Sequence, residues 1–142
     1  MMSRTHDLTL KWTTVTQDAD DISFWDMIVS GQSLYHAFGS GNVCILGSVR
    51  LEFEPAVIDR LLLVEPGDYP SGRVALYVCS YCAHLDCGAI SVQITREGPH
   101  IVWSDFRDTH RHDEEGFEAI DAVGPFRFEF AAYRDALLGR TR

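Results

Sequence analysis

Basic residues are scarce in this sequence. The 142-residue chain has 12 Lys and Arg against 21 Asp and Glu, a formal net charge of −9. A surface of this sign repels the phosphate backbone of nucleic acids and the headgroups of anionic membranes. We therefore expect no direct binding to nucleic acid or membrane, whereas a basic protein partner would be attracted.

Long apolar runs are also missing. No stretch has the length needed to cross a bilayer, and the first seven residues contain no apolar segment of the kind found in secretory signals. A cytoplasmic location is the resulting expectation. The 46% hydrophobic content is nevertheless typical of a folded globule, and the length predicts a single domain over residues 1–142.

The common catalytic motifs are absent as well. The sequence has no Gly-rich phosphate loop, no nucleophile elbow and no His-Glu-x-x-His. A loop with His110 and His112 among carboxylates has residue types suited to acid–base work, but such charged loops are more often solvated surface. The absence of a complete set of catalytic residues favours a binding protein over an enzyme.

What the chain does contain is a run of β-prone segments from residue 72 to residue 106. Two turns divide this run into three segments, and Ile90, Val92 and Ile94 alternate with polar residues in the middle one. The alternation predicts an antiparallel sheet with one covered face. We therefore expect one α+β domain, in which two or three short helices pack on one face of an antiparallel sheet built on this central meander.

The other segments are expected to pack around this sheet. Ile22, Trp25 and Ile28 recur at helical spacing, and residues 34–38 alternate before a Gly-rich turn. The alternative for the second region is a helix that continues through Tyr35. The predicted elements are a strand at 8–15, a helix at 22–30, a hairpin at 33–46, a helix at 55–62, an exposed loop at 107–124, a strand at 126–130 and a helix at 131–138.

Three of the four cysteines lie in the first turn of the meander. Cys79, Cys82 and Cys87 could supply three thiolates to zinc, which needs four ligands. The candidates for the fourth ligand are water and the side chains of His84, Asp86, His100, His110 and His112. A redox pair is a second interpretation, but no helix N-terminus is predicted there to lower a thiol pKa. Structural thiols are the interpretation that we favour, and Cys44, inside an apolar run, is expected to be a small buried side chain.

The turn and its surroundings carry a family resemblance. Residues 76–89, 102–106 and 124–128 resemble a group of small, uncharacterised bacterial proteins whose turn reads Cys-Pro-x-Cys-Gly-Asp-x-x-Cys-Gly. Some of these proteins are labelled oxidoreductases. The resemblance implies a shared fold and almost nothing about activity. This chain departs from the pattern at Ser80, Ala83 and His84, where the family has Pro, Gly and Asp.

The acidic residues are clustered. Residues 12–49 contain four Asp and no Lys or Arg, and residues 105–121 contain seven acids against Arg107 and Arg111. Charge that served only solubility would be interspersed with the opposite sign. We therefore expect an acidic protein-binding module, in its concrete form an immunity protein that forms a heterodimer with a basic toxin such as a nuclease. The alternative is a small zinc- or thiol-containing protein that resembles an oxidoreductase.

The expected partner surface combines these acids with apolar anchors, with Tyr35 as a further anchor if it is exposed. Its residues are Asp18, Asp20, Asp21, Trp25, Asp26, Asp108, Asp113, Glu114, Glu115, Phe117, Glu118 and Asp121.

Overall fold

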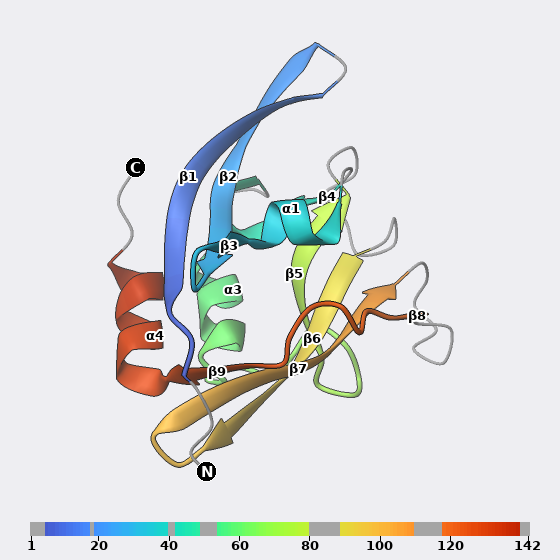
Figure 1. Ribbon diagram of the computed structural model, residues 1–142. Coiled ribbons are helices and arrows are strands. Elements are labelled where there is room, and N and C mark those ends of the chain that lie inside the picture. Colours follow the sequence, from blue (N-terminus) through green and yellow to red (C-terminus); the bar gives the residue numbers. More distant parts are fainter. Residues whose placement is uncertain are drawn as a thin grey trace.

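The described part of the chain folds into two antiparallel sheets with four short helices (Figure 1). The computed structural model describes residues 5–17, 19–39, 42–48, 54–79, 89–109 and 118–139. The smaller sheet has the strand order β1-β2-β3. Its strands are β1 (Leu8–Gln17), β2 (Asp20–Val29) and β3 (Gln32–Ser33).

The larger sheet is built on the predicted meander. Strands β5, β6 and β7 pair consecutively and antiparallel, and β4 extends the sheet beyond β5. On the far side of β7, β8 pairs near its end and β9 pairs near its start. The strands are β4 (Asn42–Cys44), β5 (Val74–Cys79), β6 (Ala89–Glu97), β7 (His100–Thr109), β8 (Glu118–Ala119) and β9 (Phe126–Glu129).

The described residues include four helices, and the α+β class is confirmed. The expected helix after Pro55 is present and buries Val57, Ile58 and Leu61. The last helix is also present; it buries Tyr133 and Leu137 and leaves Leu138 59% exposed. The helices are α1 (Leu34–Phe38), α2 (Ile45–Ser48), α3 (Glu54–Leu61) and α4 (Phe130–Leu138). None of the helices described is long and apolar enough to span a bilayer.

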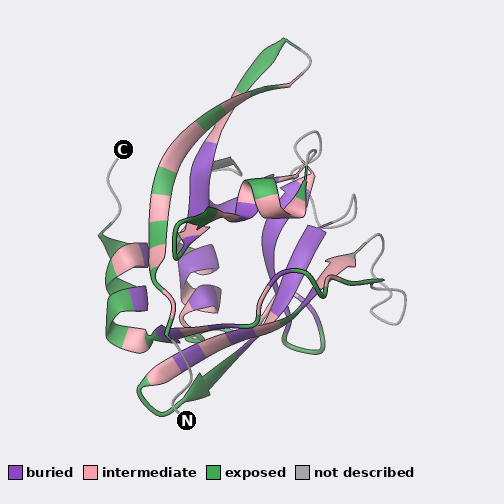
Figure 2. Ribbon diagram, viewed as in Figure 1, coloured by how far each residue is buried: buried purple, intermediate pink, exposed green. Residues whose placement is uncertain are grey.

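The core lies between the two sheets and against α3 and α4 (Figure 2). Trp103, Tyr77 and Tyr133 are its largest fully buried side chains. Their polar atoms are satisfied internally: the Trp103 indole N–H donates to the Tyr133 hydroxyl at 3.3 Å, and that hydroxyl donates to the Leu61 carbonyl at 2.6 Å. Cys44 is buried as expected, and burial raises the pKa of its thiol.

The predicted helix at 22–30 is wrong, because this segment is strand β2. It pairs with β1 along its whole length, from Leu8 opposite Val29 to Gln17 opposite Asp20. Residues 24–27 are all buried, which means that both faces of the strand are covered. A strand covered on both faces loses its alternation, and the remaining apolar residues matched a helical period by coincidence.

The predicted hairpin at 33–46 is also wrong. Its first half is the short helix α1, which Ser33 caps by accepting the His36 N–H at 3.3 Å. Ser is a preferred N-cap residue because its hydroxyl replaces a missing intrahelical acceptor. The second half, β4, pairs with β5 instead. In the predicted loop at 107–124, β7 continues to Thr109 and β8 follows, whereas residues 110–117 lie outside the described part.

A buried arginine holds an irregular region of the larger sheet. The ladders on both sides of β6 shift register close to Ser91. The Arg73 guanidinium donates to the Ser91 hydroxyl at 2.9 Å and to the Asp105 carboxylate at 3.0 Å, and it also reaches the backbone carbonyls of both residues. Asp105 lies in the left-handed region at φ +56°. A β-bulge interrupts the hydrogen bonds between neighbouring strands. At the interruption beside Ser91, the Arg73 guanidinium supplies hydrogen bonds to the strand.

Candidate partner-binding surface

The β1–β2 hairpin projects from the body of the protein (Figure 1). Near the body, the two strands are joined by an edge-to-face contact between Trp12 and Trp25, whose ring centroids lie 5.1 Å apart, and Trp25 belongs to the buried core. Towards the tip, exposed and half-buried residues replace buried ones (Figure 2). The hairpin is therefore anchored at one end and presents its other end to solvent.

Hydroxyl and carboxylate groups are paired across one face of this tip. The hydroxyls of Thr14 and Ser23 lie 2.8 Å apart, and the Thr16 hydroxyl donates to the Asp21 carboxylate at 2.8 Å. Asp20, opposite Gln17, is exposed. Cross-strand pairs of this kind stabilise an antiparallel ribbon. Asp20 and Asp21 are thus presented on an ordered support.

Trp25 and Asp26, expected in the partner surface, are internal. Trp25 is 2% exposed and Asp26 is 4% exposed, so neither side chain can meet a partner. Trp25 packs against Trp12, as described above. Tyr35, the further anchor, is half-buried, and its ring packs on Phe24.

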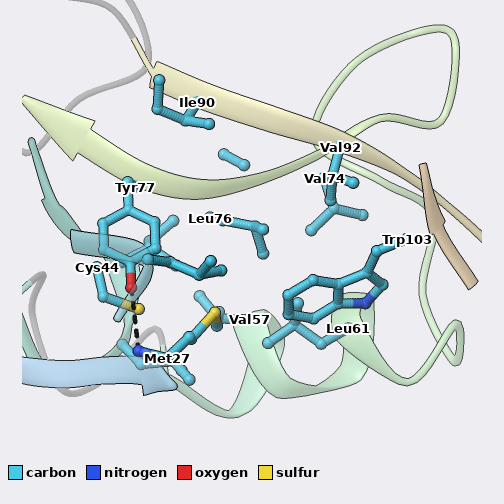
Figure 3. Packing of buried hydrophobic residues seen from close by; sticks show 14 of the residues in the cluster. Met27, Cys44, Val57, Leu61, Val74, Leu76, Tyr77, Ile90, Val92 and Trp103 are labelled. Carbon is cyan, nitrogen blue, oxygen red and sulfur yellow. Dashed lines mark hydrogen bonds between the residues drawn. The ribbon is translucent and has the colours of Figure 1, made fainter. Parts of the chain in front are cut away.

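The Asp26 carboxylate instead joins the two sheets. It accepts the Ser33 hydroxyl at 2.5 Å, the Tyr35 N–H at 3.2 Å and the Tyr77 hydroxyl at 2.6 Å. The Tyr77 oxygen in turn accepts the Met27 N–H at 3.0 Å (Figure 3). Burial, with the nearby anionic groups, raises the pKa of Tyr77. The network satisfies a buried carboxylate, which would otherwise be costly, and it explains an acid among the buried residues of β2.

The second acidic region lies at the edge formed by β7 and β8. Asp108 and Glu118 are directly opposite each other in this ladder, and Asp121 is exposed in the turn that follows. Like charges in opposing positions destabilise a strand pair. These carboxylates therefore add negative charge to the edge at some cost in stability.

The structure does not merge the two acidic regions. The hairpin tip and β8 lie at separate corners of the molecule (Figure 1). Among the described residues the tip carries only Asp20 and Asp21 of the expected acids. The remaining expected positions lie outside the described residues: Asp18, Asp113, Glu114, Glu115 and Phe117.

Of the three cysteines expected to bind zinc, only Cys79 lies within the described residues. It ends β5 with a half-buried, free thiol, whereas Cys82 and Cys87 lie outside the described residues. His100 is not a suitable fourth ligand, because Cys79 lies near the Ala89 end of β6 and His100 pairs with the opposite end. That end is roughly 25 Å away along the strand. Within the described part of the chain, no three metal-binding side chains come together.

Sequence reasoning missed a polar cleft at the base of the hairpin. A cleft of about 680 Å³ is lined by residues that include His6, Asp7 and Ser30. A catalytic triad uses the same residue types, but it requires a hydrogen bond from the serine hydroxyl to the histidine ring, and the hydrogen bonds here have other partners. The Ser30 hydroxyl accepts the Asp7 backbone N–H at 3.1 Å, and His6 Nδ1 accepts the Arg127 N–H at 3.2 Å. The described contacts therefore show no serine activated by a histidine base.

Comparisons of the chain with protein-family models, with curated proteins and with solved structures found no match. The resemblance of the cysteine turn to the bacterial family stays a prediction. The candidate surface therefore rests on its own geometry.

Proposed function

We propose that this protein is an acidic protein-binding module, and specifically an immunity protein that neutralises a basic, nucleic-acid-cleaving bacterial toxin. The observation that carries the proposal is the projecting hairpin with Asp20 and Asp21 exposed at its tip. No Lys or Arg occurs from residue 12 to residue 49, so the sequence around the tip supplies no compensating charge.

The shape and the charge of the hairpin tip both suit a cationic groove. A nuclease must present a cationic groove to bind the phosphate backbone. A two-stranded ribbon is narrow enough to enter a groove, and carboxylates at its end would meet the cationic lining first. The net charge of −9 adds a long-range field that steers a cationic partner towards the protein.

The test measures association with any basic protein that a neighbouring gene encodes. We expect Asp20→Asn combined with Asp21→Asn to lower the association rate by roughly three- to tenfold at low salt, and to reduce its dependence on salt. Asp135→Asn is the matched control, because Asp135 is an exposed acid on α4. Equal effects of the control and of the tip variant would remove the tip from the interface, and no binding by the wild type would end the hypothesis.

The loop acids are tested separately. Asp113, Glu114 and Glu115 are neutralised together, and the association rate is measured against the same partner. A reduced rate and a shallower salt dependence are expected if this acidic stretch belongs to the surface. An unchanged rate would confine the interface to other parts of the protein.

A further inference from the structure

Strand β1 is an edge of the smaller sheet. Among the described residues β2 pairs with one side of β1, and no strand pairs with the other side between residues 8 and 17. Helix α4 lies beside the part of β1 that is near the body (Figure 1). Towards its tip, the strand extends beyond α4 (Figure 1).

The pairing register tells which backbone groups face this edge. In an antiparallel pair, residues alternate between those that exchange hydrogen bonds with the partner strand and those whose N–H and C=O point away. A two-residue loop separates Gln17 from Asp20, so this closing pair exchanges hydrogen bonds. The backbone groups of Thr14 and Thr16, which fall in the alternate pairs, therefore point to the open edge.

Two contacts elsewhere in the hairpin agree with this alternation. Met27 belongs to an outward-facing pair, and its N–H leaves the hairpin to reach the Tyr77 hydroxyl. His6 is an even number of residues from Thr14, so its N–H points to the same side, and it donates to the Arg127 carbonyl at 2.7 Å. The outer side of the segment that leads into β1 therefore already binds another strand, β9.

The charge of the chain decides which occupant suits the open edge. A second copy of the protein would bring two chains of net charge −9 together, and they would repel. An extended cationic segment would be attracted. Asp21 shares a face with Thr16, and β2 is two strand spacings, about 10 Å, from the position of an added strand. The long side chains of Lys and Arg reach across such a gap.

We infer that residues 13–16 of β1 form a docking edge, on which a cationic partner adds an extended strand and directs a basic side chain across Thr16 to Asp21. This inference rests on the proposed function, from which it takes the cationic partner. The added strand gains main-chain hydrogen bonds from Thr14 and Thr16, and the acids at the tip select its charge. Its basic residues lie towards the tip, because the exposed acids Asp20 and Asp21 lie there.

The probe is a synthetic decapeptide of alternating Thr and Lys, compared with one of alternating Thr and Glu. Amide hydrogen exchange of the whole protein is measured with and without saturating peptide. The Thr–Lys peptide is expected to slow exchange at Thr14 and Thr16 by at least about threefold, as a new hydrogen bond at each amide would. Thr13 and Val15, which bond to β2, should change less.

Two variants separate the backbone from the side chain. Thr14→Pro removes one outward N–H, which an edge strand tolerates, whereas Thr14→Val keeps the N–H and removes only the hydroxyl. We expect Thr14→Pro to weaken peptide binding by about threefold or more and Thr14→Val to leave it within about twofold. Thermal unfolding of each variant verifies that the hairpin stays folded.

Several results would overturn the docking edge. These are no added protection at Thr14 and Thr16, equal binding by Thr14→Pro and Thr14→Val, equal binding of the acidic peptide, or the same protection caused by self-association without peptide. The two proposals fail separately. Protection of the edge without any basic protein partner contradicts only the proposed function, and partner binding that depends on Asp20 and Asp21 but not on the Thr14 N–H contradicts only the docking edge.

Discussion

A single hydroxyl, that of Tyr77, connects the two sheets. It donates to Asp26 and accepts the Met27 N–H, and all three residues are buried. Tyr77→Phe removes both bonds and leaves a buried N–H without its acceptor. We expect the free energy of unfolding to fall by about 2 kcal/mol, measured by urea denaturation.

The control for this variant is Tyr35→Phe. Tyr35 is half-buried, and within the described residues its hydroxyl makes no hydrogen bond. Its loss should cost less than about 0.5 kcal/mol, in the range of substitutions away from such networks. Equal costs for the two variants would show that the bridge between Asp26 and Met27 is not a source of stability.

Asp105 makes stability depend on pH in acid. The Arg107 hydrogen bond, together with Arg73, holds the pKa of its carboxyl below the ordinary value of 3.8. The folded state therefore binds fewer protons than the unfolded state, and this contribution is present above the unfolded pKa and is lost as pH falls through the lower folded pKa. We expect Asp105→Asn to flatten the decline in urea midpoint between about pH 5 and about pH 2. An unchanged acid profile would contradict this assignment.

At the scale of elements, the helical turn α2 packs closely on the hairpin at Gly47. A Cβ added there would lie 2.9 Å from Trp12 Cζ3 and 3.3 Å from Phe24 Cα, and the residue has φ +89°. Gly31 has nearly the same φ, +88°, but no atom within 4 Å of an added Cβ. Gly31→Ala should cost about 1 kcal/mol from strain alone, and Gly47→Ala at least about 2 kcal/mol, because overpacking is added.

Thermal and urea unfolding of the two glycine variants provide the comparison. Similar losses for both would mean that the contact between α2 and the hairpin relaxes freely. A larger loss for Gly47→Ala would show that the base of the hairpin is rigidly supported by the body of the protein.

Whether an element was predictable from sequence depended on how many of its faces are covered. The alternation of Ile90, Val92 and Ile94 identified β6, and the apolar face after Pro55 identified α3. Strand β2 was missed because its second face is covered by Tyr35, from the helix that follows β3, and by Tyr77, which lies 51 residues beyond Asp26 in the sequence. Local patterns hold no information about such long-range cover.

The candidate surface shows the same limit. Clustering of charge pointed to Asp20 and Asp21, which are exposed, but also to Asp26, which is buried. Asp26 follows Asp21 closely in the sequence. The pairing register places Asp20 and Asp21 at the tip of the hairpin, whereas Asp26 lies in the core. The bulge contacts of Arg73 with Asp105 were equally invisible, since no local signal pairs residues 32 positions apart.

At the scale of the whole molecule, the cysteine turn gives a prediction about metal content. We favour structural thiols, so protein purified without chelator should contain no stoichiometric zinc by elemental analysis, and chelator should leave the melting temperature unchanged. One zinc per chain, together with a melting temperature that falls on chelation and in Cys79→Ser, would show that the turn binds metal.

The bridge between His6 and Phe128 has a consequence for the order of folding. Strands β1 and β2 are adjacent in sequence and can pair as soon as both exist, but the contact of His6 with Arg127 spans 121 residues. Closing so long a loop is slow. During synthesis the early hairpin therefore waits for β9 and α4 with the outer side of β1 open along its whole length. This interval is when the open strand is most exposed to pairing with other extended segments, and a chaperone that covers an open strand would act then.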